Sequence, residues 1–215
     1  MTDTVTPTRR RRVSNVAKAA QTSETTQAVK TITVLGIDPA MSNFGFVLAQ
    51  LNPITGAIVG VPQVKLVSTA GTKDKKTIRK SSDDLRRARE LFEPMAAWVE
   101  LADMVCSEMP LGSQNSSAMK SVGMCLGLLA SISKPLIQVM PDEVKLASVG
   151  IKTASKADMI AWAVGQYPDV NWLTRNGKVG APLTNANEHI ADAFGVIHAA
   201  VRTDNFKLMA MGFAR

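Results

Sequence analysis

Acidic residues in three separate parts of the sequence have the chemistry to act together. Asp38 follows the apolar run "VLGI", Glu108 follows "MVCS", and Asp192 lies in "NEHIADAF" together with Glu188 and His189. Carboxylates gathered at one place repel one another unless a cation neutralises them, and their oxygens suit Mg²⁺ or Mn²⁺. Two such ions about 4 Å apart can activate a water and stabilise the leaving oxygen in phosphodiester cleavage. The sequence therefore predicts a site for Mg²⁺ (or Mn²⁺) that acts on phosphodiester bonds, with the candidate ligands Asp38, Glu108, Asp192, His189 and Glu188.

Each of these residues also has a purely structural interpretation. Asp38 precedes a proline and could cap a turn, and Glu108 could lie in a solvated loop. Glu188 could be the N3 glutamate of a capping box whose N-cap is Asn185. A single histidine such as His189 is more often a surface residue than a ligand. The chemical interpretation rests on the combination, because each signal alone is weak.

The last acidic segment belongs to a predicted helix from about Asn187 to Arg202. At about 100° per residue, Glu188 and Asp192 lie about 40° apart around its axis. The apolar stripe of the same helix points elsewhere and consists of Ile190, Phe194, Ile197 and Val201. By periodicity the acids are therefore not core residues.

Three strands are expected before the first helix. Residues 31–37, 44–51 and 57–68 are rich in apolar and β-branched side chains, and the turn sequence "NPITG" separates the last two. Short links between strands are typical of an antiparallel meander.

Helices and strands then alternate. We expect a helix over about 83–101 that its internal Pro94 kinks or splits, a strand at 104–110, a helix over 116–133 and a strand at 135–141. Short helices near 142–148 and 155–166 and a polar loop over 168–186 lead to the last helix. This order predicts an α/β fold with a mixed five-stranded sheet flanked by helices.

The composition indicates a globular protein that acts in a reducing compartment. The 215 residues are 46% hydrophobic and 20% charged, which is enough for one sizeable core. No apolar stretch reaches the roughly 18 residues of a membrane span, and no secretory signal is evident. Cys106 and Cys125 form no CxxC pair, which argues against zinc and disulfides. We therefore expect a cytoplasmic location.

The positive charge suggests contact with nucleic acid. The net charge is +7, and residues 1–30 hold six Lys or Arg against two acidic residues. This segment is Thr/Ser-rich without an apolar period, so we expect a disordered basic tail at 1–30 that binds nucleic acid, acts as a targeting signal or is simply solvated. A second basic segment could contact DNA phosphates with Lys73, Lys75, Lys76, Arg79 and Lys80.

Four segments resemble one known family. In order they are "GIDPAMSNFGF", "SEMPLGSQNSSAMKSVGMCLGLL", "MPDEVKLASVGIKTASKADM" and "HIADAFGVIHAA", and the match that contains them runs from about Ile32 to Thr203. Together they resemble the RuvC family of Holliday-junction resolvases in the RNase H-like superfamily. The resemblance implies an RNase H-like nuclease domain at 31–215 with Gly45 in the turn after the first strand. It also implies metal-binding acids at Asp38, Glu108 and Asp192, with His189 as a fourth catalytic residue and Lys145 and Lys156 on the DNA. The setting that it implies is a bacterium or a phage-infected host cell.

The implied activity is metal-dependent cleavage of Holliday junctions or related branched DNA by a homodimer, with the helix at 116–133 as the expected dimer surface. Leu111 stands where relatives carry an aromatic residue, so a nuclease with broader specificity for branched DNA remains an alternative. A non-catalytic junction-binding protein on the same fold is another. A sugar-kinase-like or actin-like ATPase is disfavoured, because the body is short and "DPAMSN" lacks the glycines of a phosphate loop.

Overall fold

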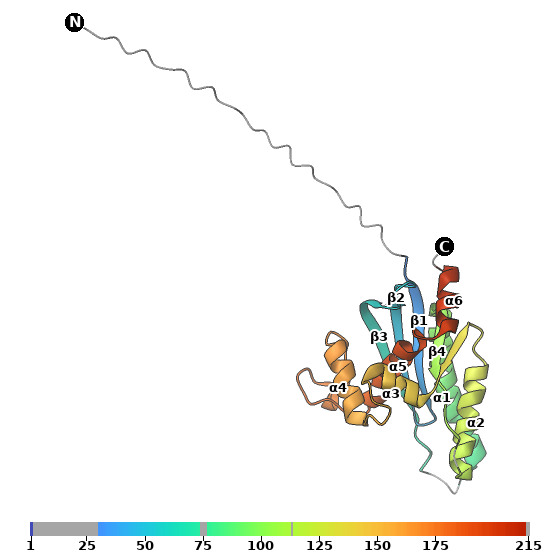
Figure 1. The fold of residues 1–215 in the computed structure, drawn as a ribbon. Helices are drawn as coiled ribbons and strands as arrows, with labels where there is room; N and C mark the ends of the chain where they lie inside the picture. The colour runs from blue at the N-terminus through green and yellow to red at the C-terminus, as the bar shows by residue number, and fades with distance from the viewer. Residues whose placement is uncertain (2–29, 74–76, 113, 214–215) are drawn as a thin grey trace.

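The sheet expected from the sequence is present. A computed structural model describes Met1 and residues 30–73, 77–112 and 114–213. It contains a five-stranded sheet in the order β3-β2-β1-β4-β5 (Figure 1). The strands are β1 (Ile32–Ala40), β2 (Asn43–Leu51), β3 (Ile58–Ser68), β4 (Met104–Glu108) and β5 (Leu136–Val139). The first three are antiparallel neighbours, whereas β4 and β5 run parallel to β1, which confirms a mixed sheet.

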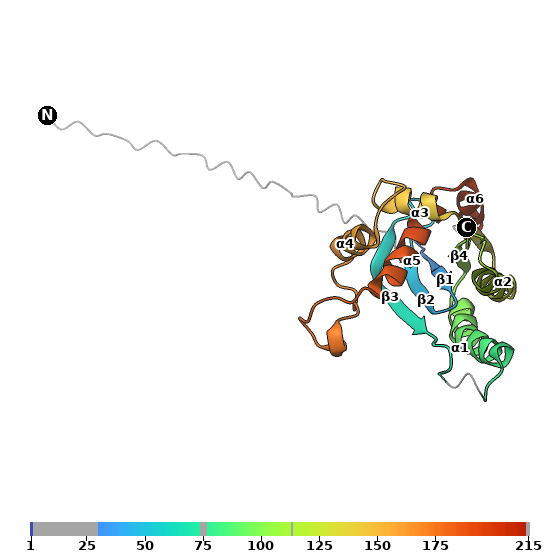
Figure 2. The ribbon, with the colours of Figure 1, turned by 90° about the horizontal axis from the view of Figure 1, so that it is seen from below.

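Helices cover both faces of this sheet, as Figure 2 shows. They are α1 (Lys80–Leu101), α2 (Ser116–Ala130), α3 (Pro141–Ser148), α4 (Lys156–Gln166), α5 (Asn187–Ala200) and α6 (Asp204–Phe213), with a short 3₁₀ turn at Arg175–Gly177. Apolar residues of α1 and α2 form one core with one face of the sheet. Those of α3, α4, α5 and α6 form the other core on the opposite face. The protein is therefore a three-layer α/β/α structure.

The pleat of β1 decides which layer Asp38 meets. Successive side chains of a strand point to opposite faces. Leu35 and Ile37 lie in the core with α1 and α2, whereas Val34 lies in the core with α5. Asp38 is in phase with Val34 and therefore faces α5.

Two glycines let α5 lie directly on the sheet. A Cβ at Gly45 of β2 would be 1.9 Å from the carbonyl oxygen of His189. A Cβ at Gly36 of β1 would be 2.4 Å from the carbonyl oxygen of Ala193. Gly45 pairs directly with Asp38 in the β1–β2 register. The start of α5 is therefore held against the strand position that carries the acid.

Several sequence-based expectations need correction. β1 continues to Ala40, so Asp38 lies inside the strand and does not cap a turn, and Gly45 lies within β2 rather than in the preceding turn. α1 runs unbroken through Pro94, so the helix is neither split nor ended there. α6 was not expected at all; it is short, and it buries only Phe206 and Ala210.

The predicted disordered tail at 1–30 falls almost wholly on residues 2–29, outside the described residues, so the division into a tail and a domain at 31–215 stays a prediction. In the described part of the chain, no helix combines the length and the apolar character that crossing a bilayer requires.

Candidate active site

Two of the predicted acids meet at one edge of the sheet. Ile37 of β1 pairs with Ser107 of the parallel strand β4, which puts Asp38 beside Glu108. Glu108 is in phase with Cys106, a residue of the core under α5, so both acids face that helix. Their neighbourhood follows from the parallel pairing, because two parallel strands end at the same edge.

The first turns of α5 bring the remaining predicted residues to this edge. Nδ1 of His189 lies 2.7 Å from Oδ2 of Asp38, so the ring donates a hydrogen bond to that carboxylate. Asp192 lies one turn further along α5, close enough to Asp38 and Glu108 that the charges act on one another. The structure thus gathers Asp38, Glu108, His189 and Asp192 in one cluster.

Burial and mutual repulsion raise the pKa values of this cluster, so its carboxylates favour a bound proton or cation. Burial, together with the charges of Asp38 and Asp192, raises the pKa of Glu108 to about 8. Burial and the charge of Asp38 raise the pKa of Asp192 to about 7. Burial also raises the pKa of Asp38, although the hydrogen bond and charge of His189 oppose it. For His189, burial lowers the pKa, but the hydrogen bond and the surrounding carboxylates outweigh it and the pKa is raised. Every member binds a proton more tightly than usual, as expected where carboxylates outnumber cations.

The donor chemistry of this cluster fits a hard divalent cation. Three carboxylates and an imidazole come from β1, β4 and α5, and oxygen donors are the ligands that Mg²⁺ and Mn²⁺ favour. Among the residues that the structure describes, no three His, Cys, Asp or Glu side chains surround one point closely enough to hold an ion. A cation would therefore require these side chains to rotate toward a common centre.

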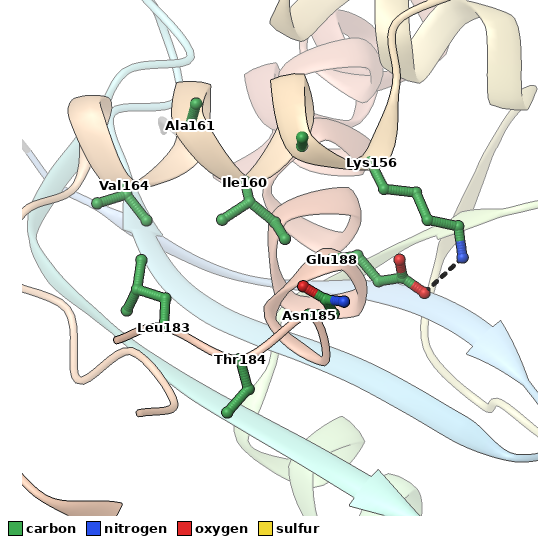
Figure 3. Close-up of a pocket in the computed structure, with 9 residues that line it drawn as sticks. Lys156, Ile160, Ala161, Val164, Leu183, Thr184, Asn185 and Glu188 are labelled. Atoms are coloured by element: carbon green, nitrogen blue, oxygen red, sulfur yellow. Dashed lines mark hydrogen bonds and ion pairs between the residues drawn. The ribbon is translucent and has the colours of Figure 1, made fainter. Parts of the chain in front are cut away.

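Glu188 has a different environment from the other acids. Its Oε1 accepts a hydrogen bond from Nζ of Lys156 at 2.8 Å (Figure 3). The same oxygen lies 3.4 Å from Nε2 of His189. The capping-box interpretation is wrong, because the N-cap of α5 is Ala186 and no described side chain caps it. Asn185 instead precedes the helix and is exposed.

The predicted DNA-contacting residues lie at the same edge where the structure describes them. The positive charge of Lys145 on α3 partly offsets the rise in the pKa values of Glu108 and Asp192. The amine of Lys145 therefore lies near both acids. Lys156 begins α4. The basic segment follows β3, whose last residue pairs with the first residue of β2. At the other end of this segment, Nζ of Lys80 donates a hydrogen bond to Oγ of Ser117 at 3.3 Å. Arg79 is the N-cap of α1 and Lys73 is described, whereas Lys75 and Lys76 lie outside the described residues.

Two positioning residues were not singled out from the sequence. Gly36 lies inside an apolar strand, and an isolated glycine there is a signal for a close backbone approach. Asn187 is fully buried, and its side chain accepts from the amide of Leu173 at 2.9 Å and donates to the carbonyls of Leu173 and Thr184. These hydrogen bonds connect the loop before α5 to the first turn of α5, which carries the site. No local sequence pattern predicts such a role.

Comparisons with known proteins support the architecture. Neither the protein-family models nor the curated proteins give a match to the sequence. Among solved structures, Thermus thermophilus RuvC in complex with a Holliday-junction substrate is 19% identical, with a TM-score of 0.50, over 78% of this chain and 92% of that chain. This chain has the fold of RuvC. The yeast mitochondrial Holliday-junction resolvase Ydc2 is 11% identical with a TM-score of 0.46, over 84% of this chain and 82% of that chain. The RuvC-like fold confirms the RNase H-like sheet expected from the four sequence segments.

Proposed function

We propose that this chain is a metal-dependent endonuclease that cuts Holliday junctions or related branched DNA. The observation that carries the proposal is the convergence of Asp38, Glu108 and Asp192 with His189 at the edge of a RuvC-like sheet. The structurally similar RuvC was solved with a Holliday-junction substrate, which supports this class of DNA as the substrate.

The chain's own residues supply binding and orientation for this chemistry. Lys145 and Lys156 flank the acids and would attract the phosphates on either side of the bond that is cut. Asp38 fixes the ring of His189 by accepting from Nδ1, so Nε2 is the ring atom that can hold or move a proton. When bound, Mg²⁺ or Mn²⁺ would supply Lewis-acid stabilisation of the developing negative charge, and Asp38, Glu108 and Asp192 would hold it.

We also propose that the active form is a homodimer, since two symmetric cuts on a two-fold junction are most simply made by a two-fold protein. The outer side of α2 supports this proposal. Met119 and Leu126 are exposed there, and a Cβ at Gly123 or Gly127 would meet no described atom within 4 Å. Leu126→Arg should convert a dimer to a monomer in sedimentation velocity, whereas a wild-type monomer would refute the proposal.

The activity is tested with a labelled synthetic four-way junction. The wild type should cut it with Mg²⁺ or Mn²⁺ and not with EDTA, whereas Asp38→Asn should abolish cleavage and retain junction binding in EDTA. Asparagine removes one charge and one anionic oxygen while nearly preserving the shape of the side chain. Wild-type cleavage by this variant would contradict the site.

The same assay distinguishes the alternatives. Equal cleavage of flaps and forks would indicate a broader branched-DNA nuclease, for which the exposed Leu111 in place of an aromatic residue is the relevant feature. Junction binding without cleavage under any divalent cation would indicate a non-catalytic junction-binding protein.

A further inference from the structure

The ion pair between Lys156 and Glu188 joins two very unequal partners. The side chain of Lys156 is 79% exposed, whereas that of Glu188 is 14% exposed. Lys156 extends from the start of α4 across to Glu188 at one end of a hollow of about 680 Å³, whose walls include Ile160 and Leu183 (Figure 3). The lysine can therefore swing into solvent, while the glutamate is held by the helix that carries the site.

Glu188 also stands between this lysine and the acidic cluster. The same atom, Oε1, lies 2.8 Å from Nζ of Lys156 and 3.4 Å from Nε2 of His189, and the other ring nitrogen of His189 is bonded to Asp38. The arrangement is a continuous line of polar contacts from the solvent to the buried acid. Glu188 is thus already engaged on both sides, unlike Glu108 and Asp192, for which the described residues show no ion pair.

We propose that Glu188 is a positioning residue that holds Lys156 beside the acidic cluster in the free protein and yields it to a phosphate of the DNA. This inference rests on the proposed function, since it assigns a partner to Lys156 within the same site. A DNA phosphate near the edge is a second anion that competes for the ammonium group. Because Lys156 is exposed, it exchanges one anion for the other without moving the backbone, and the ion pair opposes DNA binding until it breaks.

This exchange makes an unusual prediction about affinity. In Glu188→Gln, Lys156 no longer has to leave a charged partner, so the variant should bind DNA more tightly than the wild type. An ion pair with one solvent-exposed partner predicts a gain of about two- to five-fold in affinity. A role in folding alone predicts no gain, whereas a simple loss of repulsion between Glu188 and the DNA phosphates also predicts one.

A double-mutant cycle separates the ion pair from simple repulsion. Binding to a labelled four-way junction and to a duplex of the same length is measured in EDTA for the wild type, Glu188→Gln, Lys156→Met and the double variant. Lys156→Met should weaken binding, and in that background Glu188→Gln should change the affinity by less than about 1.5-fold. Asp204→Asn is the matched control, because it removes one acid of the Asp204–Lys207 pair on α6, beyond the far end of α5. Its affinity should equal that of the wild type.

Three outcomes would overturn the proposal: unchanged or weaker binding by Glu188→Gln, the same gain in the Lys156→Met background, or an equal gain in the Asp204→Asn control. Failure of the proposed function has a different signature, namely a wild type that shows no metal-dependent cleavage or no preference for the junction. The exchange is still measured in that case, because duplex DNA presents the same phosphates.

Discussion

Gly45→Ala tests how closely α5 must approach the sheet. The new Cβ would be 1.9 Å from the carbonyl oxygen and 2.4 Å from the carbonyl carbon of His189, both backbone atoms. To restore a contact of 3.4 Å, the first turn of α5 must move away by about 1.5 Å. Overpacking of this kind costs about 1–3 kcal/mol, and the lack of a flexible neighbour predicts the upper end. The shift would also separate His189 from Asp38, whose contact is 2.7 Å.

The assay combines stability with activity. Urea unfolding should show a loss of about 3 kcal/mol for Gly45→Ala, and cleavage of the four-way junction under folding conditions should fall by about 100-fold, the typical effect of a 1 Å misplacement. Gly165→Ala in α4 is the matched control, because its Cβ would meet no described atom within 4 Å. Alanine there should stabilise the helix by up to about 1 kcal/mol. Wild-type stability and cleavage in Gly45→Ala would refute the close packing of α5 on β2.

Three further predictions follow from the site and its surroundings. Asp192→Asn should lose far more Mg²⁺-dependent cleavage than Glu188→Gln, since only the former is assigned to the metal; equal losses would put Glu188 among the metal ligands. Burial, together with the charge of Arg202, lowers the pKa of His198 to about 4, so the unfolded chain takes up this proton first as the pH falls. Between pH 7 and pH 4 the wild type should therefore lose about 3 kcal/mol more unfolding free energy than His198→Gln, and parallel curves would contradict this. Deleting residues 1–29 should leave cleavage at saturating protein intact. It should flatten the slope of log affinity against log salt by at most about 3.6, the value for four engaged arginines. Loss of cleavage would make the tail part of the catalytic fold.

The order of elements followed from the sequence alone, and so did the choice of three candidate acids that the structure brings together. Buried strands and amphipathic helices leave local patterns of period 2 and 3.6. Of the elements in the described residues, the five strands and five of the six helices were therefore expected at nearly their observed positions. The acids were identifiable because each interrupts or follows an apolar run. The helix α6 was not predicted from the sequence; it is short, and only Phe206 and Ala210 of it are buried.

Only the tertiary structure decided what each acid faces. Asp38 and His189 are 151 positions apart, and their contact depends on the strand pleat, on the β1–β2 register and on two glycines that admit α5. Glu188 was ambiguous between a cap and a ligand, and the structure gave it a third partner, Lys156, from another helix. Local patterns record which residues are buried, but the partners of a polar side chain depend on how distant elements pack, and that information is not local.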